Sequence, residues 1–305
     1  SNLEMGYVFE DLIRRFNEQN NEEAGEHFTP REIIKLMTNV VFKPIKEELK
    51  DGGTYLVYDP ACGSGGMLTE AKKFIKNPKG EIKSDAKIHL YGQEINPETY
   101  AICKADMLIK EEDPDKIIYG STLKTNGFPN LEFDFMLTNP PYGKSWKADE
   151  KEVRNEHKMD ADKDYADFNG RLGAGIPRIN DGQMLFDCNM LSKMKKTSKL
   201  GSRIASVHNG SALFTGDAGS GESNIRKWII ENDMLEGIIA MPTDLFYNTG
   251  IATYIWVLTN RKSPERQGKI QLVNAVDFYK PMRKSLGNKR KEISPEQIEE
   301  ISKIY

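Results

Sequence analysis

The segment Asn139-Pro140-Pro141-Tyr142 carries the most specific chemical signal in this sequence, and it follows the apolar run Phe133–Leu137. An exocyclic amino group on a nucleobase is a poor nucleophile because its lone pair is delocalised into the ring. The side-chain oxygen of Asn139 and the carbonyl oxygen of Pro140 can accept the two amino hydrogens and direct the lone pair at a methyl donor. The prolines fix the direction of that carbonyl, and the ring of Tyr142 can stack on a base lifted from a duplex. The alternative is a Pro-Pro turn that only closes a strand.

A glycine-rich segment upstream has the composition of a ligand-binding turn. Residues 59–66, with the sequence Asp-Pro-Ala-Cys-Gly-Ser-Gly-Gly, stand between the apolar run Tyr55–Tyr58 and a helical pattern that begins at Met67. Glycines allow a tight turn and a close approach of the backbone to a ligand, and the free amides at a helix start favour acceptor atoms. For this segment taken alone, a tight turn without a ligand is the alternative.

An acidic residue, Glu94, follows the next apolar run, Ile88–Tyr91. A carboxylate at this place is the usual partner of the two ribose hydroxyls of a nucleoside ligand. Asp59 disfavours a dinucleotide, whose pyrophosphate would pass the turn, and favours a ligand with an ammonium group, such as the methionine part of S-adenosylmethionine. A later pair of glycines has the spacing of an ATP-binding loop, but Glu222 stands where such a loop requires lysine.

Hydrophobic patterning predicts the elements that must position these residues. Short apolar runs alternate with helix-compatible segments, which indicates an open, mostly parallel α/β sheet with helices on both faces. In such a sheet, ligands bind at the carboxyl ends of the strands, where the three motifs stand. The predicted strands are Tyr55–Tyr58, Ile88–Tyr91, Ile117–Tyr119, Phe133–Leu137, Ile204–Val207, Leu235–Ala240 and Thr253–Leu258.

Two helices are predicted before the first strand. Apolar residues between positions 4 and 19 follow helical spacing with a single buried face. The second helix is expected to start with Thr29 as its N-cap, Pro30 at the first helical position and Glu32 completing a capping box. The longest irregular segment, 144–181, is expected to be a long loop near the target base, where either DNA contact or mobility would explain it.

The composition argues against several classes of protein. The 305 residues carry 43 basic and 46 acidic side chains, a formal charge of −3, which is unlike a domain that grips DNA unaided. Three separated cysteines and four histidines without ligand spacing argue against a disulfide framework or a structural zinc site. No run approaches the roughly 18 apolar residues of a membrane span, and no signal peptide is visible, so we expect a cytoplasmic protein without a membrane partner.

The chain resembles the adenine-specific DNA methyltransferases in four segments, which occur in the family's order: His27-Phe28-Thr29-Pro30, residues 59–66, residues 92–97 (Gly-Gln-Glu-Ile-Asn-Pro) and residues 139–142. More narrowly, it is similar to the modification (methyltransferase) subunit of bacterial type I restriction-modification systems over about residues 4–262, including 205–214 and 235–253. The resemblance implies a Rossmann-like S-adenosylmethionine-dependent methyltransferase fold, with a mostly parallel seven-stranded sheet whose last strand is antiparallel. It also implies transfer of a methyl group from S-adenosylmethionine to N6 of an adenine in DNA.

The resemblance assigns a cofactor site. In such enzymes the segment before the first strand closes over the methionine end of the cofactor, the glycine turn holds its amino and carboxylate groups, and the next acid binds the ribose. The cofactor-binding residues implied here are Glu26, His27, Phe28, Thr29, Asp59, Cys62, Gly63, Ser64, Gly65, Glu94, Ile95 and Ser121. Thr29 has helix capping as a competing role. Ser121 departs from the family, which more often has Asp or Asn there to read the adenine amino group of the cofactor.

The resemblance also assigns the reacting site. Asn139, Pro140, Pro141 and Tyr142 form the catalytic group, with no metal required. Tyr142 and Phe246 sandwich the flipped adenine from opposite sides, and a core position is the alternative for Phe246.

The domain organisation and partners are also expected from this resemblance. Residues 1–50 form a helical segment that closes the cofactor pocket, 51–262 form the catalytic domain, and 263–305 form a charged extension. The chain starts at Ser1 rather than Met, so we expect it to be part of a longer protein.

The implied partners are double-stranded DNA, a specificity subunit that chooses the site, a second modification subunit and a restriction (nuclease-translocase) subunit. Two alternatives stay open: an amino-methyltransferase that acts on RNA or on a protein glutamine, and a non-catalytic assembly module.

Overall fold

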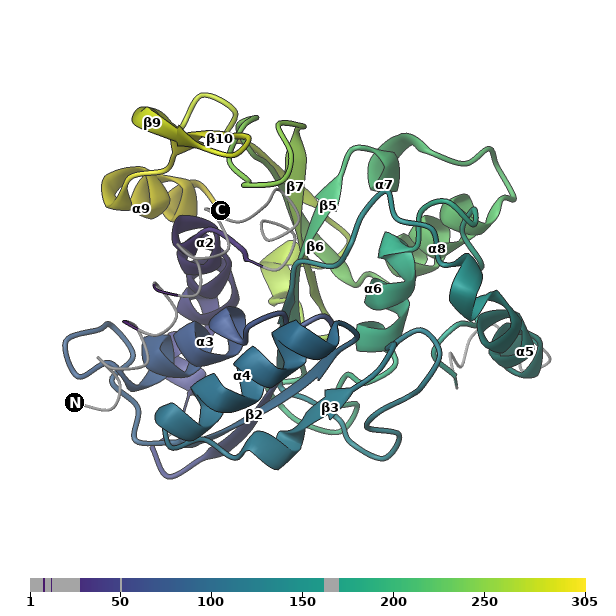
Figure 1. Ribbon diagram of the computed structural model, residues 1–305, viewed down its shortest axis with the longest axis horizontal. Helices are drawn as coiled ribbons and strands as arrows, with labels where there is room; N and C mark the ends of the chain where they lie inside the picture. The colour runs from purple at the N-terminus through teal and green to yellow at the C-terminus, as the bar shows by residue number, and fades with distance from the viewer. Residues whose placement is uncertain (1–7, 9–11, 13–27, 50, 162–169) are drawn as a thin grey trace.

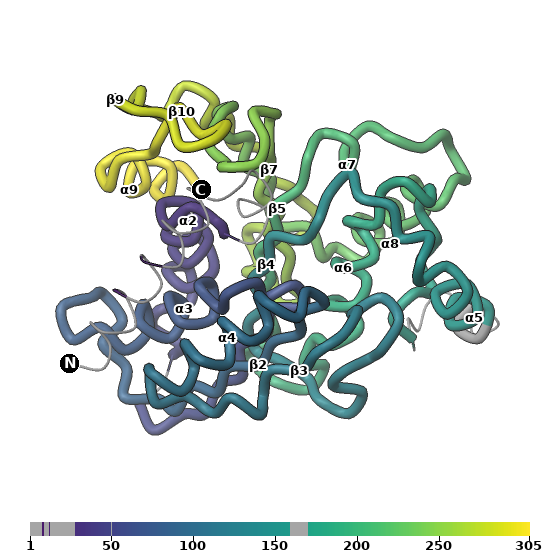
Figure 2. The backbone as a smooth tube through the Cα atoms, viewed as in Figure 1, coloured from purple at the N-terminus to yellow at the C-terminus, as the bar shows by residue number. Residues whose placement is uncertain are grey.

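The computed structural model describes residues 8, 12, 28–49, 51–161 and 170–305, with the side chains of 159–161 excepted (Figures 1 and 2). Apart from Val8 and Leu12, the helix predicted between residues 4 and 19 lies outside the described residues, as do the predicted cofactor residues Glu26 and His27. No helix within the described ranges has both the length and the apolar character of a membrane span.

An eight-stranded sheet forms the centre of the molecule, in the order β3-β2-β1-β4-β5-β7-β6-β8. Neighbouring strands are parallel except around β7, which is antiparallel to both β5 and β6. The strands are β1 (Thr54–Asp59), β2 (Lys87–Glu94), β3 (Ile117–Tyr119), β4 (Phe135–Thr138), β5 (Arg203–Asn209), β6 (Leu235–Ala240), β7 (Thr253–Thr259) and β8 (Gln271–Asn274).

All seven predicted strands are confirmed to within a few residues, as is the antiparallel direction of the seventh. The predicted number of strands was wrong, because β8 pairs with β6 in parallel and adds an eighth. This strand has four residues and lies at the edge of the sheet, where only Val273 is buried. A half-exposed edge strand of this length carries no continuous apolar run for sequence patterning to detect.

Helices cover both faces of the sheet, as predicted (Figure 1). The helices α2 (Arg31–Phe42), α3 (Gly66–Lys76), α4 (Pro97–Ile109) and α9 (Pro295–Ile304) contribute to one apolar layer. The helices α6 (Gln183–Leu191) and α8 (Gly221–Glu231) contribute to the other. Successive strand residues point to opposite faces, so Val57 belongs to the first layer and Tyr58 to the second. The sheet is therefore buried on both sides and holds its strand ends in fixed register.

The helix α2 begins one residue later than predicted. Its N-cap is Pro30, whose extended ψ of 137° keeps it outside the helix, and no side chain caps the first turn. Thr29 is therefore not the cap, and its hydroxyl is turned to Asn139 instead. The Glu32 carboxylate likewise forms no capping box and pairs with the ammonium group of Lys289.

The described residues of the stretch 144–181 include helical segments, where the sequence predicted a loop. They contain the 3-10 turn η4 (Lys147–Asp149) and the helix α5 (Glu150–Ala161), which projects from the rest of the molecule (Figure 1). This helix carries almost only polar residues, so it lacks the apolar stripe that indicates a helix in sequence.

Residues 263–305 return to the main body of the molecule. They contain the 3-10 turn η6 (Pro264–Arg266), the strand β8, the two-stranded sheet β9 (Lys280–Leu286) and β10 (Lys289–Glu292), and α9. Helix α9 packs against α2, as Figure 2 also shows at the C-terminus of the chain. The division into residues 1–50, 51–262 and 263–305 stays a prediction. The last of these segments is continuous with the central sheet, because its strand β8 pairs with β6.

The remaining short elements connect these layers. They are η2 (Lys43–Glu48), η3 (Pro114–Lys116) and α7 (Ser211–Phe214).

Candidate active site

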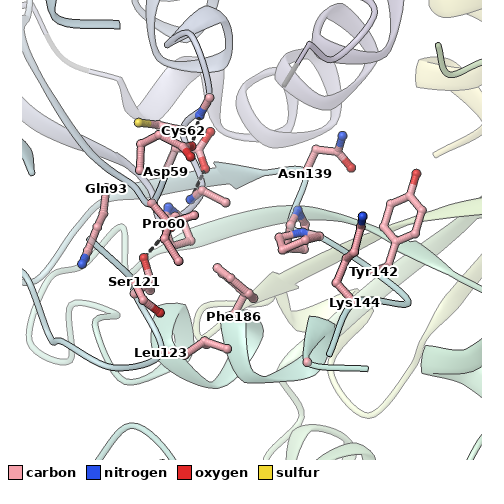
Figure 3. Close-up of a pocket in the computed structure, with 18 of the residues that line it drawn as sticks. Asp59, Pro60, Cys62, Gln93, Ser121, Leu123, Asn139, Tyr142, Lys144 and Phe186 are labelled. Carbon is pink, nitrogen blue, oxygen red and sulfur yellow. Dashed lines mark hydrogen bonds between the residues drawn. The ribbon is translucent and has the colours of Figure 1, made fainter. Parts of the chain in front are cut away.

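A cavity of about 330 Å³ opens at the carboxyl ends of β1 to β4, where the predicted motifs converge (Figure 3). This volume falls in the range of roughly 300–1,000 Å³ that small-molecule sites occupy. Its walls come from the segment before α2, the glycine turn, the ends of β2 and β3, and the segment after β4. The predicted residues that line it are Phe28, Thr29, Asp59, Cys62, Gly63, Ser64, Glu94, Ile95, Ser121, Asn139, Pro140, Pro141 and Tyr142.

Asp59 is a buried carboxyl group at the inner wall of the cavity. Its Oδ1 accepts hydrogen bonds from the Thr138 hydroxyl at 2.7 Å and from the Ala61 amide at 3.0 Å. Burial, with the nearby charge of Glu94, raises the pKa of Asp59 to about 7. Since Oδ1 is already engaged by the protein, Oδ2 is the atom that Asp59 can offer to a ligand. A cation there would favour the ionised form.

The glycine turn adopts the conformation that its composition predicts. Gly63 and Gly65 have φ angles of +53° and +84°, in the left-handed region that favours glycine. A Cβ atom on Gly65 would lie 2.7 Å from the methyl carbon of Met107 and 2.9 Å from the sulfur of Cys103. Gly65 does not itself line the cavity, so its observed role is to let the turn pack closely on α4.

Glu94, the last residue of β2, connects this strand to the glycine turn after β1 through hydrogen bonds. Its Oε2 accepts a hydrogen bond from the amide of Gly63 at 2.9 Å, and its Oε1 accepts one from the amide of Asn96 at 2.8 Å. Each carboxylate oxygen has a second lone pair, so the group is held in place and can still accept hydrogen bonds from a ligand. Ile95, which follows it, is 60% exposed and offers an apolar surface beside the carboxylate.

Cys62 lies in the cavity wall as a neutral thiol. The neighbouring Cys103 thiol and burial raise the pKa of Cys62 well above its usual value. Because the thiolate is the reactive form, this cysteine has no nucleophilic character at neutral pH.

Ser121, just after β3, forms hydrogen bonds with two other residues. Its hydroxyl donates a hydrogen bond to Oδ2 of Asp149 at 2.9 Å and accepts one from the amide of Lys124 at 3.3 Å. Asp149 also lines the cavity. The next residue, Thr122, donates its hydroxyl hydrogen to the Pro60 carbonyl at 2.5 Å, which joins this segment to the glycine turn.

Asn139 presents an unoccupied acceptor. Its Nδ2 donates a hydrogen bond to the Thr29 hydroxyl at 3.2 Å, which fixes the orientation of the amide. Its Oδ1 is buried, and no donor among the described residues pairs with it. A buried, unpaired acceptor costs free energy in the folded protein, so such an atom points to a ligand donor.

The aromatic residues separate into a cavity residue and a core residue. Tyr142 lines the cavity, half-buried, beside Asn139 and Lys144 (Figure 3), and burial raises the pKa of its hydroxyl. Phe246 does not line the cavity, because its ring is 2% exposed and packed into the core layer that contains Leu245. The core alternative thus describes its position.

Sequence reasoning assigned no role to several further cavity residues. Among them are Gln93, Thr122, Leu123, Lys144, Trp146, Asp149, Phe186 and Asn248. Of these, Trp146 could have been noticed as a lone aromatic residue in a polar stretch. Phe186, in contrast, is on the buried helix α6, where an aromatic residue reads as core packing.

A buried polar network supports the segment after Tyr142. The amide of Gly143 donates to Oδ1 of Asp181 at 3.0 Å, and the Gln183 amide group donates to Oδ2 of the same carboxylate at 2.8 Å. The Gln183 side-chain oxygen lies 2.9 Å from Nδ1 of His208, whose Nε2 lies 2.8 Å from Oδ2 of Asp187. His208 and Asp187 are fully buried, so the chain of contacts runs from the interior to the loop that carries Tyr142.

Comparison with known proteins places this geometry in context. A sequence profile described as N-6 DNA Methylase matches residues 2–305. The chain is 30% identical to the type I restriction enzyme MjaVII methylase subunit of Methanocaldococcus jannaschii, over 99% of this chain and 47% of that protein. It is 29% identical to the HindI methylase subunit of Haemophilus influenzae, over 89% of this chain and 54% of that protein. This chain thus spans about half the length of these curated relatives.

A solved structure confirms the fold. The type I restriction-modification system methyltransferase subunit from Streptococcus thermophilus superposes with a TM-score of 0.70 at 23% identity, over 90% of this chain and 52% of that one. The methyltransferase fold predicted from the sequence is therefore confirmed.

Proposed function

Because the chain belongs to the N-6 DNA methylase family, we propose that it transfers a methyl group from S-adenosylmethionine to the N6 amino group of an adenine in double-stranded DNA. The observation that carries this proposal is the buried, unpaired Oδ1 of Asn139 in the wall of a cavity whose inner end holds two carboxyl groups. A single cavity thus offers a site for a cationic nucleoside cofactor and an acceptor for an amino group.

The acidic end of the cavity fits S-adenosylmethionine. Oδ2 of Asp59 would receive the methionine ammonium group, and Glu94 would accept hydrogen bonds from the ribose hydroxyls. Ile95 would cover a face of the adenine, and the Gly63–Gly65 turn would lie beside the carboxylate. We propose in addition that Glu26, His27 and Phe28 close over the methionine end. The cofactor supplies an electrophilic methyl group on a sulfonium centre.

At the other end, Asn139 and Pro140 would hold the target amino group. Their two oxygens accept its hydrogens, which localises the nitrogen lone pair and aims it along the cavity. The bond from nitrogen to the methyl carbon forms as the bond from carbon to sulfur breaks, and the surplus proton on nitrogen leaves to solvent. Tyr142 would stack on the extruded base, since its hydroxyl stays protonated and its ring lies beside Asn139.

We propose that this chain works as the modification subunit of a type I assembly. A specificity subunit would choose the DNA site, a second modification subunit would complete the methyltransferase, and a restriction subunit would join for cleavage. The formal charge of −3 supports this division, because phosphate neutralisation is the main source of unaided DNA affinity. Such an enzyme works in the cytoplasm, where it meets the DNA.

The test is methyl transfer from radiolabelled S-adenosylmethionine to duplex DNA, with a specificity subunit added. The variant Asn139→Ala should keep cofactor binding and lose at least about a hundredfold in the rate of transfer. The control is Asn274→Ala, which truncates an exposed asparagine on the edge strand β8 and should leave the rate unchanged. Transfer to RNA or to a protein glutamine in preference to DNA would contradict the proposed substrate, and an unchanged rate in Asn139→Ala would contradict the mechanism.

A further inference from the structure

Asp149 enters the cavity from an element that is not one of the strand ends. It closes the 3-10 turn η4, and its amide donates a hydrogen bond to the Trp146 carbonyl at 2.9 Å. Trp146 is itself anchored: its indole nitrogen donates to the Arg178 carbonyl at 2.9 Å, its amide donates to the Ile179 carbonyl at 3.1 Å, and only 3% of it is exposed. The position of the Asp149 carboxylate is therefore set by a buried aromatic anchor.

Ser121 also holds this carboxylate, through a hydrogen bond. A serine hydroxyl has one hydrogen, and Ser121 donates it to Oδ2 of Asp149. Ser121 therefore has no hydrogen left to donate to a ligand, and one of its two acceptor lone pairs faces the Lys124 amide. Asp149 has about four acceptor lone pairs, of which Ser121 uses one. Of these two side chains, the aspartate is the stronger remaining acceptor toward the cavity.

The order of the strands places Asp149 at a defined end of the cavity. The sheet runs β3-β2-β1, so Asp59, Glu94 and Ser121 follow one another across it. The amide of Gly120 donates to the Glu94 carbonyl at 2.9 Å, which fixes the Ser121 segment next to Glu94 on the side away from Asp59. S-adenosylmethionine has its amino acid, ribose and adenine in the same order, so its adenine would lie beside Ile95, Ser121 and Asp149.

We propose that Asp149 selects the adenine ring of the cofactor by accepting a hydrogen bond from its exocyclic amino group, with Ser121 as a positioning residue that holds the carboxylate. A charged acceptor forms a hydrogen bond about twice as strong as a neutral acceptor does. A purine without the amino group would leave the carboxylate unpaired. This inference rests on the proposed function, since it concerns the same cofactor.

The test compares two ligands by calorimetric titration of the full 305-residue chain. They are S-adenosylhomocysteine and its analogue in which hydrogen replaces the adenine amino group. The unmodified chain should prefer S-adenosylhomocysteine by about tenfold or more. In Asp149→Ala this preference should fall to within about twofold, through weaker binding of the amino-bearing ligand alone. Asp149→Asn keeps an amide oxygen as acceptor and should recover part of the preference, and Ser121→Ala should give an intermediate loss.

The matched control is Glu150→Gln, which removes a carboxylate one residue further along, outside the cavity lining. It should keep the full preference, and a thermal unfolding scan of each variant should show a folded protein. An equal preference in Asp149→Ala and the unmodified chain would overturn the inference and leave the proposed function intact. Failure of the folded, unmodified chain to bind either ligand would overturn both.

Discussion

The carboxyl group of Asp59 connects ligand binding to pH. Its pKa of about 7 means that it is mostly protonated below neutrality, whereas a cationic ligand favours the ionised form. We predict that the dissociation constant for S-adenosylmethionine falls by up to about tenfold per pH unit as pH rises from about 5.5 to about 7, and then levels off. Titration calorimetry over this range measures it. Asp59→Asn should bind weakly at every pH, and a sloping profile in that variant would assign the proton to another group.

The same group affects the stability of the ligand-free protein. An acid whose pKa is raised above its unfolded value of about 3.8 keeps its proton longer in the folded state, so the free energy of unfolding decreases as pH rises through the window from about 4 to about 7. Asp59→Asn removes this penalty and keeps an acceptor for Thr138 and Ala61. Its melting temperature should exceed that of the unmodified chain at pH 8 and match it at pH 4, as differential scanning calorimetry can show.

Thr138 tunes this pKa through the hydrogen bond that it donates to Asp59. Thr138→Val keeps the shape of the side chain and removes the donor, so the pKa of Asp59 should rise and the pH midpoint of cofactor binding should move upward. The control is Thr259→Val, which removes a similarly buried hydroxyl on β7 that donates to the Ser202 carbonyl. A midpoint that moves equally in both variants would mean that the bond to Asp59 is not the cause.

At the scale of elements, the loop after β4 depends on the buried network behind it. Asp181→Ala removes the acceptor of the Gly143 amide and leaves the Gln183 amide with one partner fewer. We predict that cofactor affinity stays within about twofold while the rate of methyl transfer falls by about 10- to 100-fold, because small displacements of a reacting group are costly. Asp217→Ala, in the exposed turn after α7, is the control. Single-turnover kinetics separate the two quantities, and a loss confined to affinity would refute this role.

Sequence patterning identified the elements whose apolar side chains are buried against other elements. Strands β1 to β7 are buried on at least one side and carry short runs of large apolar residues, so their positions follow from composition. The edge strand β8 and the polar helix α5 lack such runs, so hydrophobic patterning does not detect them. The start of α2 was misplaced for a related reason: Thr29 suits an N-cap by local chemistry, but Asn139 engages its hydroxyl across the cavity.

The residues of the site also divide into those with a local sequence signal and those without one. Motifs at the strand ends were predictable, because the topology of a parallel sheet brings them to one edge. Asp149 and Trp146 were not, since their places depend on contacts with Ser121 and Arg178 that no local pattern encodes. Stacking of Phe246 on the target base stays a prediction, and in this structure its side chain is packed in the core.

At the scale of the whole molecule, a buried ion pair and its hydrogen bonds connect the sheet to helix α2 and to the C-terminal residue. Arg203 on β5 pairs with Glu236 on β6, donates to the Val40 carbonyl of α2 at 3.2 Å, and lies near the Tyr305 hydroxyl that also reaches Glu236. Each of the two charged residues is less than 5% exposed. None of these residues lines the cavity, so we assign the cluster a role in stability.

We predict that Glu236→Gln lowers the free energy of unfolding by about 3–5 kcal/mol, because it leaves the Arg203 charge buried without its partner. Urea titration measures the change. Glu231→Gln, which removes one partner of an exposed ion pair with Lys227, should change it by less than about 0.5 kcal/mol. Cofactor affinity should be unchanged in both variants below their unfolding midpoints, and a selective loss of affinity in Glu236→Gln would place the cluster in the site after all.

The reversed direction of β7 has a consequence for how this protein can change. Since β6 and β7 are consecutive and antiparallel, the connection between them leaves and returns at the cavity edge of the sheet without a helical crossover. Asn248 of that connection already lines the cavity. Insertions there would lengthen a loop whose two ends are already neighbours, at a closure cost of only about 0.6 kcal/mol for each doubling of its length. Evolution can therefore remodel this rim of the cavity while the register of the other strands stays unchanged.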